Sequence, residues 1–109
     1  MPLQPLVINL DTTITGYTKI LGGPPDSKFM RSGNVLLLPG ESVGEHSTKS
    51  NEELIIVLEG RGQFIVENNL YMEFNANSVL YCPPMTKHNI QNTSSTPLRY
   101  IYVVSKASE

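Results

Sequence analysis

Hydrophobic residues along the chain fall into short runs of strand length, and turn residues separate these runs at spacings of roughly eight to twelve residues. Val, Ile, Leu, Tyr and Thr dominate the runs, which is the β-branched and aromatic bias of strands. No stretch combines helical periodicity with capping residues. The pattern therefore predicts an all-β sandwich or barrel. Its predicted strands are Leu6–Leu10, Thr13–Ile20, Asn34–Leu38, Leu54–Leu58, Gln63–Val66, Val79–Cys82 and Leu98–Val104.

The length of 109 residues suits one domain spanning 1–109. Eight basic and ten acidic residues leave a net charge of −2, and the basic residues are scattered singly. A nucleic-acid partner is therefore not expected, because no basic stripe is present to neutralise phosphates.

Compartment and membrane attachment follow from what the chain lacks. The N-terminal residues have no basic region followed by a long apolar stretch, and no apolar run approaches the roughly 20 residues of a membrane helix. The one cysteine, Cys82, allows no internal disulfide and is expected to pack as a small hydrophobic residue. We expect a cytoplasmic protein that does not associate with membranes.

The candidate chemistry lies in the two histidines, His46 and His88, and the carboxylate of Glu53. His46 lies on a short predicted strand and Glu53 begins the next, so a hairpin would pair the two strands. His88 would join them from a third strand. Two imidazoles and a carboxylate are ligands for Zn, Fe, Mn, Ni or Cu. On spacing alone, however, two histidines in a chain of this length are more often surface or hydrogen-bonded residues than ligands.

The spacing of the wider pattern changes that weighting. One segment, residues 40–60, reads Gly40, five residues, His46, one residue, Thr48, four residues, Glu53, six residues, Gly60. A second, residues 77–92, reads Asn77, five residues, Pro83, one residue, Met85, two residues, His88, three residues, Asn92. The pair closely resembles the two motifs of the cupin superfamily, small single-domain cupins of the conserved-barrel type in particular.

The resemblance implies a double-stranded β-helix, the jelly-roll barrel of cupins. It also implies a pocket in which His46, Glu53 and His88 bind a divalent transition metal. Small cupins are commonly homodimers, so we expect one here, with Leu6–Leu10 or Thr13–Ile20 covering a sheet edge of the partner.

Three positions depart from the family motifs. Asn77 and Met85 replace glycines, and Asn tolerates the positive φ that such turns require. Thr48 stands where the second histidine of the first motif is usual. We expect Thr48 to face the pocket without binding the metal, because a neutral hydroxyl is a poor ligand. The remaining two-histidine, one-carboxylate set suits Fe(II) and leaves coordination positions for substrate or O2. The metal could also be Mn, Ni or Zn, and the change to Thr48 could equally mean weaker metal binding or no metal binding.

The fold does not choose among functions. One hypothesis is a metal-dependent dioxygenase or isomerase acting on a small organic or sugar-like substrate. An alternative is a metal-independent module that binds or senses a sugar or organic acid, and a third is a structural protein with a vestigial pocket. Four tyrosines could offer hydroxyls to a ligand, but strand tyrosines with hydroxyls at the surface are the expectation: Tyr71, Tyr81, Tyr100 and Tyr102.

Overall fold

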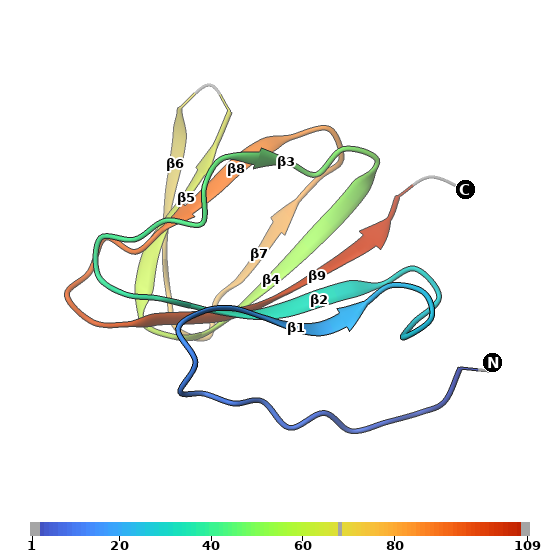
Figure 1. Cartoon of the computed structure of the whole chain (residues 1–109). Coiled ribbons are helices and arrows are strands. Elements are labelled where there is room, and N and C mark those ends of the chain that lie inside the picture. Colours follow the sequence, from blue (N-terminus) through green and yellow to red (C-terminus); the bar gives the residue numbers. More distant parts are fainter. Residues whose placement is uncertain (1–2, 68, 108–109) are drawn as a thin grey trace.

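The computed structural model describes residues 3–67 and 69–107, and in this part of the chain it contains strands and turns but no helix (Figure 1). Accordingly, no helix in these residues is long and apolar enough to cross a membrane. The strands are β1 (Gly16–Gly22), β2 (Arg31–Leu37), β3 (His46–Ser47), β4 (Asn51–Glu59), β5 (Arg61–Val66), β6 (Leu70–Asn75), β7 (Val79–Cys82), β8 (Lys87–Gln91) and β9 (Leu98–Lys106).

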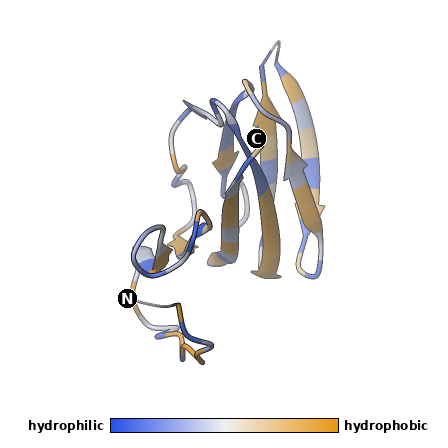
Figure 2. Cartoon of the chain, turned by 90° about the vertical axis from the view of Figure 1, so that its right-hand side faces the viewer, coloured by the Kyte–Doolittle hydropathy of each residue, from blue (hydrophilic) through white to orange (hydrophobic). Residues whose placement is uncertain are grey.

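Two antiparallel sheets form the jelly-roll barrel, a double-stranded β-helix as expected. One sheet has the order β1-β2-β9-β4-β7 and the other the order β3-β8-β5-β6. Hydrophobic residues are concentrated in the strands (Figure 2). Because side chains alternate between the two faces of a strand, each sheet contributes one face to the core. The core residues are Val35, Leu37, Ile55, Val57, Phe64, Phe74, Cys82, Ile90, Leu98 and Tyr100.

Most of the predicted strands are confirmed, and the one nearest the N-terminus is wrong. Val79–Cys82 coincides with β7, and Leu98–Val104 lies within β9. Residues Leu6–Leu10 have strand composition but form no strand. They run in an extended path beneath β1 and β2 (Figure 1), without a neighbouring strand to supply hydrogen bonds. The predicted strands did not include β6, and the third strand expected to carry His88 was given no bounds, because the polar residues of β8 lack strand bias and only its pairing with β5 and β3 makes it a strand.

The predicted hairpin between the strand of His46 and the strand of Glu53 is wrong. β3 pairs with β8, whereas β4 pairs with β7 and β9 in the other sheet. A tight turn between them is closed by the hydrogen bond from the Asn51 amide to the Thr48 carbonyl, 3.0 Å. This turn carries the chain across from one sheet to the other, so His46 and Glu53 approach each other from opposite sheets instead of lying side by side on one sheet.

Two turn residues that replace family glycines have positive φ. Asn77 has φ of 69° and Met85 has φ of 56°. The value for Asn77 agrees with the expectation, because Asn tolerates this region. Met85 has no such compensation, and its side chain is 72% exposed, so it gains little from packing.

Met85→Gly should therefore raise the free energy of unfolding by about 0.5–1 kcal/mol, since relief of left-handed strain exceeds the entropic cost of glycine. Urea unfolding of the variant and the wild type measures the difference. Asn77→Gly is the matched control and should change stability by less than about 0.5 kcal/mol. A Met85→Gly protein less stable than the wild type would show that the Met85 turn is not strained.

Candidate metal centre

His46, Glu53 and His88 come together at one point of the cavity, where Glu53 and His88 are buried and His46 is exposed. Each offers a ligand atom, and these atoms lie within 4.8 Å of one another. His46 on β3 is directly opposite His88 on β8 in the strand register, and their ring centroids are 4.2 Å apart. Glu53 approaches from β4 of the facing sheet. The structure thus assembles the three side chains from both sheets.

Backbone carbonyls orient both imidazoles. Nδ1 of His46 lies 2.8 Å from the Gly44 carbonyl oxygen, and Nδ1 of His88 lies 3.1 Å from the Thr86 carbonyl oxygen. A carbonyl oxygen only accepts hydrogen bonds, so each Nδ1 carries the hydrogen. Nε2 is then the nitrogen that can ligate a metal on both rings. This arrangement, in which an outer hydrogen bond fixes the ring, is typical of metal-binding histidines.

Glu53 and His88 also form a buried pair. Oε1 of Glu53 is 2.7 Å from Nε2 of His88, and both side chains are almost fully buried. Burial alone lowers the pKa of His88, but its hydrogen bonds to the Glu53 carboxylate and the Thr86 carbonyl outweigh this and raise the pKa above its ordinary value. A metal ion bound to Nε2 would have to displace the proton between the two groups.

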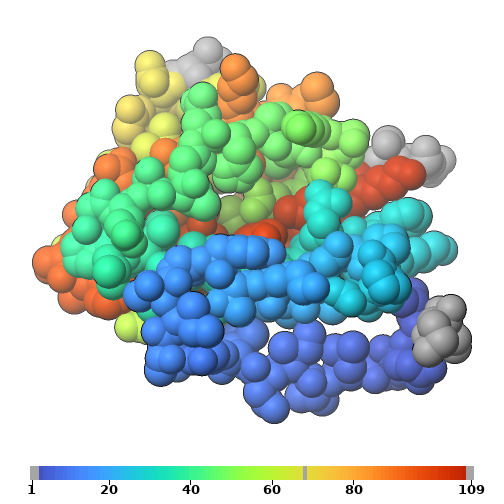
Figure 3. Space-filling view, viewed as in Figure 1, coloured from blue at the N-terminus to red at the C-terminus, as the bar shows by residue number. Residues whose placement is uncertain are grey.

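A cavity of about 830 Å³ surrounds the three residues. The space-filling view shows the molecule hollowed between the segment around β3 and strand β1, with β4 and β9 behind (Figure 3). Its walls mix polar and hydrophobic side chains, and the lining includes Tyr17, Arg31, Thr48, Ile90, Tyr100 and Tyr102. The volume suits a small organic molecule.

Two of the four tyrosines were placed wrongly from sequence. Tyr71 and Tyr81 are exposed, as expected, but Tyr100 is only 2% exposed and Tyr102 lines the cavity with it. Both lie on β9 at even steps from the buried Leu98, so they share its inward face. That alternation was readable in the sequence. Burial raises the pKa of Tyr100, which therefore stays a neutral phenol facing the cavity.

Thr48 lines the cavity, one residue beyond the end of β3. Its hydroxyl donates to the Pro83 carbonyl at 2.7 Å and accepts from the Thr86 amide at 3.1 Å. The backbone amide of Thr48 also donates to the Thr86 carbonyl, the same oxygen that orients His88. Thr48 therefore joins the end of β3 to the loop before β8, a structural role that the motif comparison did not reveal.

Thr48→Val should lower the free energy of unfolding by about 2 kcal/mol, because the shape is kept while the Pro83 carbonyl and the Thr86 amide lose their partner inside the protein. Thr48→Ser keeps the hydroxyl, so its free energy of unfolding should fall by less than half of the loss in Thr48→Val. Chemical denaturation of the two variants beside the wild type gives the comparison. Equal stability of the valine and serine variants would remove this role from Thr48.

Cys82 is fully buried, opposite Glu53 in the register between β4 and β7. Burial, with a smaller contribution from the charges of Glu53 and Glu67, raises the pKa of its thiol to about 11. The neutral thiol packs in the core, which fits the expectation of a small hydrophobic residue.

Similar proteins share this fold. An uncharacterised protein of Methanocaldococcus jannaschii is 34% identical over 56 residues, which are 51% of this chain; the chain spans only 44% of that relative's length. A crystal structure of a Bacillus halodurans protein superposes with a TM-score of 0.83 at 18% identity, over 97% of this chain and 84% of that one. A Cupin 2 conserved barrel domain protein of Salinispora arenicola gives a TM-score of 0.74 at 24% identity, over 98% and 90%.

At these identities the structural matches establish the fold alone. The family assignment comes from the sequence, because residues 33–104 match the family model described as Cupin domain. That range contains both motifs and strands β2 to β9 almost entirely. The chain therefore belongs to the cupin domain family.

Proposed function

We propose that the protein binds one divalent transition metal through His46, Glu53 and His88 and acts on a small organic substrate in the adjoining cavity. The observation that carries the proposal is the convergence of the three ligand atoms within 4.8 Å in a cavity of about 830 Å³. The orientation of both rings by backbone carbonyls supports it further, since the hydrogen bond at Nδ1 leaves Nε2 of each ring as the nitrogen that can bind a metal.

Each residue would have a role set by its position in the cavity. His46 and His88 would hold the ion through Nε2, and Glu53 would serve as a ligand and not as a free base. A bound metal would supply a Lewis acid or, if iron, an activator of O2, which is the chemistry of an isomerase or a dioxygenase. Ile90 and Tyr100 make the inner wall, which keeps bulk water from the substrate.

The proposal is tested by measuring whether catalytic turnover depends on the three proposed metal ligands. Protein stripped with EDTA and reloaded with Fe(II), Mn, Ni or Zn would be incubated with panels of hydroxy acids, oxo acids and sugar phosphates. Oxygen uptake reports a dioxygenase, and NMR in D2O reports an isomerase. The proposal expects turnover by one metal form that EDTA and His88→Ala both abolish. Metal-loaded protein whose turnover equals that of His88→Ala across the panels would refute it.

A second candidate is a metal-independent module that binds a sugar or organic acid. The bond between Glu53 and His88 favours it, because two of the three supposed ligands already satisfy each other at 2.7 Å. The replacement of the usual second histidine by Thr48 points the same way. This candidate predicts that small ligands raise the melting temperature in the presence of EDTA, and that added metal has no further effect.

A homodimer is also proposed, and the outer face of the five-stranded sheet supports it. Leu54, Val79 and Tyr81 are 40%, 62% and 56% exposed on the neighbouring strands β4 and β7. Apolar side chains gathered in this way mark an interface more often than a solvated face. Light scattering should give twice the chain mass of 12.1 kDa, and Val79→Lys should give a monomer. A monomeric wild type at micromolar concentration would contradict this.

A further inference from the structure

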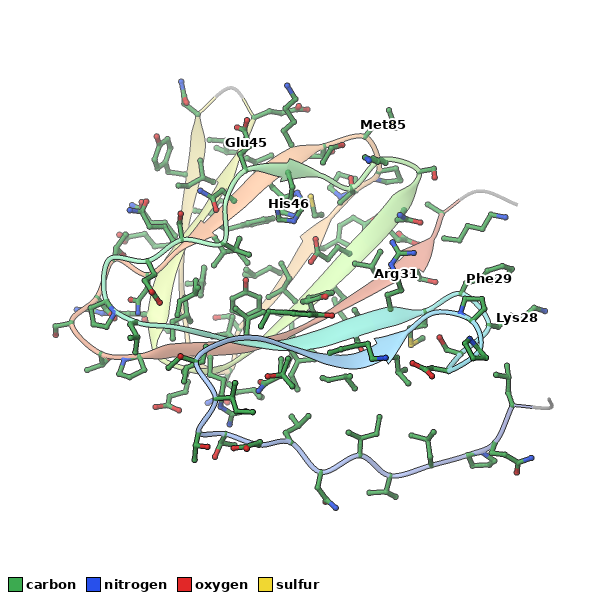
Figure 4. All side chains as sticks on the ribbon, viewed as in Figure 1. Lys28, Phe29, Arg31, Glu45, His46 and Met85 are labelled. Atoms are coloured by element: carbon green, nitrogen blue, oxygen red, sulfur yellow. The ribbon has the colours of Figure 1, made fainter. Side chains whose placement is uncertain are left out.

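Arg31 lies level with the metal triad across the five-stranded sheet. It is opposite Val104 in the pairing of β2 with β9, and Val104 is in turn opposite Glu53 in the pairing of β9 with β4. Neighbouring strands are about 4.8 Å apart, so the Cα atoms of Arg31 and Glu53 are separated by roughly 10 Å. Both residues line the cavity. Figure 4 shows Arg31 pointing from β2 toward the space into which His46 points from β3.

The charge of Arg31 has no counterpart among the residues that the structure describes. No ion pair or side-chain hydrogen bond includes it there. Of the cavity carboxylates, Glu53 is paired with His88, and Glu41 accepts a hydrogen bond from the Leu38 amide at 2.7 Å. Figure 4 shows Glu45 on the outer side of the chain at β3, away from His46. Among the described residues that line this cavity, Arg31 is thus the one lysine or arginine.

An aromatic wall stands beside Arg31. The rings of Tyr17 and Tyr102 are nearly parallel, with centroids 6.1 Å apart and an angle of 22° between their planes. Gly33, two residues from Arg31 on the same face of β2, makes room for them. A Cβ at Gly33 would lie 2.5 Å from a Tyr17 ring carbon and 2.6 Å from a Tyr102 ring carbon. The missing side chain therefore lets the two rings lie over β2, where both tyrosines line the cavity together with Arg31.

We infer that the ligand of this cavity is a small organic acid whose carboxylate binds Arg31 while an oxygen at its other end reaches the metal triad. The guanidinium matches a carboxylate with two parallel hydrogen bonds. The tyrosine rings cover the carbon chain between the two ends. The metal end of this inference rests on the proposed function, and the Arg31 end does not.

Calorimetric titration with dicarboxylates of increasing length tests the inference. Malonate, succinate and glutarate would be titrated into zinc-loaded and EDTA-treated protein, each beside its uncharged diamide. The variants are Arg31→Gln, Arg31→Lys and the matched control Arg61→Gln, which removes an exposed arginine outside the cavity. At least one dicarboxylate should bind the wild type and Arg61→Gln at least ten-fold more tightly than Arg31→Gln, with Arg31→Lys between them. The diamides should bind at least ten-fold more weakly than the acids.

Three results would each overturn the inference. The first is that none of the dicarboxylates binds the wild type, and the second is that Arg31→Gln binds them as tightly as the wild type does. The third is equal affinity for a dicarboxylate and its diamide. Zinc titration separates this failure from that of the proposed function. Arg31→Gln should bind zinc like the wild type, since Arg31 is not a ligand. If the wild type binds no zinc, the proposed function fails, and binding of the dicarboxylates to EDTA-treated protein still decides the role of Arg31.

Discussion

His88→Ala should weaken binding of Zn²⁺, Mn²⁺ and Ni²⁺ by about 100-fold or more. The imidazole is one of the three proposed protein ligands, and loss of a ligand costs more than the roughly 10–100-fold typical for the residues that merely orient ligands. His88 is also the side chain through which β8 reaches both His46 and Glu53. Calorimetric titration of metal-stripped protein measures the affinities of the variant and the wild type.

The neighbouring residue Glu52 provides a matched control for a substitution of Glu53. Glu53→Gln keeps the shape of the side chain and removes the charge, so metal affinity should fall strongly. Glu52→Gln makes the same change one residue earlier, on the opposite face of β4, where Glu52 accepts a hydrogen bond from the Tyr81 hydroxyl at 2.7 Å. Its metal affinity should equal that of the wild type. Equal behaviour of the two glutamine variants, or an unchanged affinity in His88→Ala, would remove the triad as the metal site.

Gly60→Ala should lower the free energy of unfolding by about 3 kcal/mol or more, since overpacking adds to left-handed strain. Gly60 connects β4 to β5 with φ of 85°. A Cβ there would lie 2.3 Å from the Pro97 carbonyl oxygen and 2.9 Å from the Cα of Leu98. These are backbone atoms at the start of β9, which cannot move without disturbing the central strand of the five-stranded sheet.

Gly40→Ala isolates the contribution of the clash. Gly40 has the same φ of 85°, but a Cβ there would meet nothing within 4 Å. The variant should lose only the cost of left-handed backbone, about 1–2 kcal/mol. Urea unfolding of both variants gives the two values. Similar losses would mean that the close approach of β4 and β9 at Gly60 does not constrain the fold.

The sequence was sufficient for the fold class because alternation, turn residues and two spaced motifs all indicated the same architecture. It was sufficient for naming His46, Glu53 and His88 as the candidate group for a different reason. Motif spacing relates residues through the family's common topology, so it can name three side chains that converge in the structure even where the local reasoning fails. The local reasoning did fail here, since adjacent strands were assumed to form a hairpin and β3 and β4 belong to opposite sheets.

Other parts of the site depend on tertiary pairing that no local pattern encodes. Arg31 becomes a cavity residue because β9 lies between β2 and β4 and aligns it with Glu53. Thr48 takes a structural role because the loop before β8 brings Pro83 and Thr86 against its hydroxyl. Tyr100 is the exception, since its even spacing from Leu98 already indicated an inward position.

The most direct test of the central claim is anomalous X-ray diffraction from crystals of zinc-loaded protein, with data collected on both sides of the zinc absorption edge. The account predicts one strong peak per chain, about 2.0–2.2 Å from Nε2 of His46, Nε2 of His88 and a carboxylate oxygen of Glu53. Zinc bound elsewhere on the chain, with the hydrogen bond between Glu53 and His88 intact and no peak among the three side chains, would contradict it.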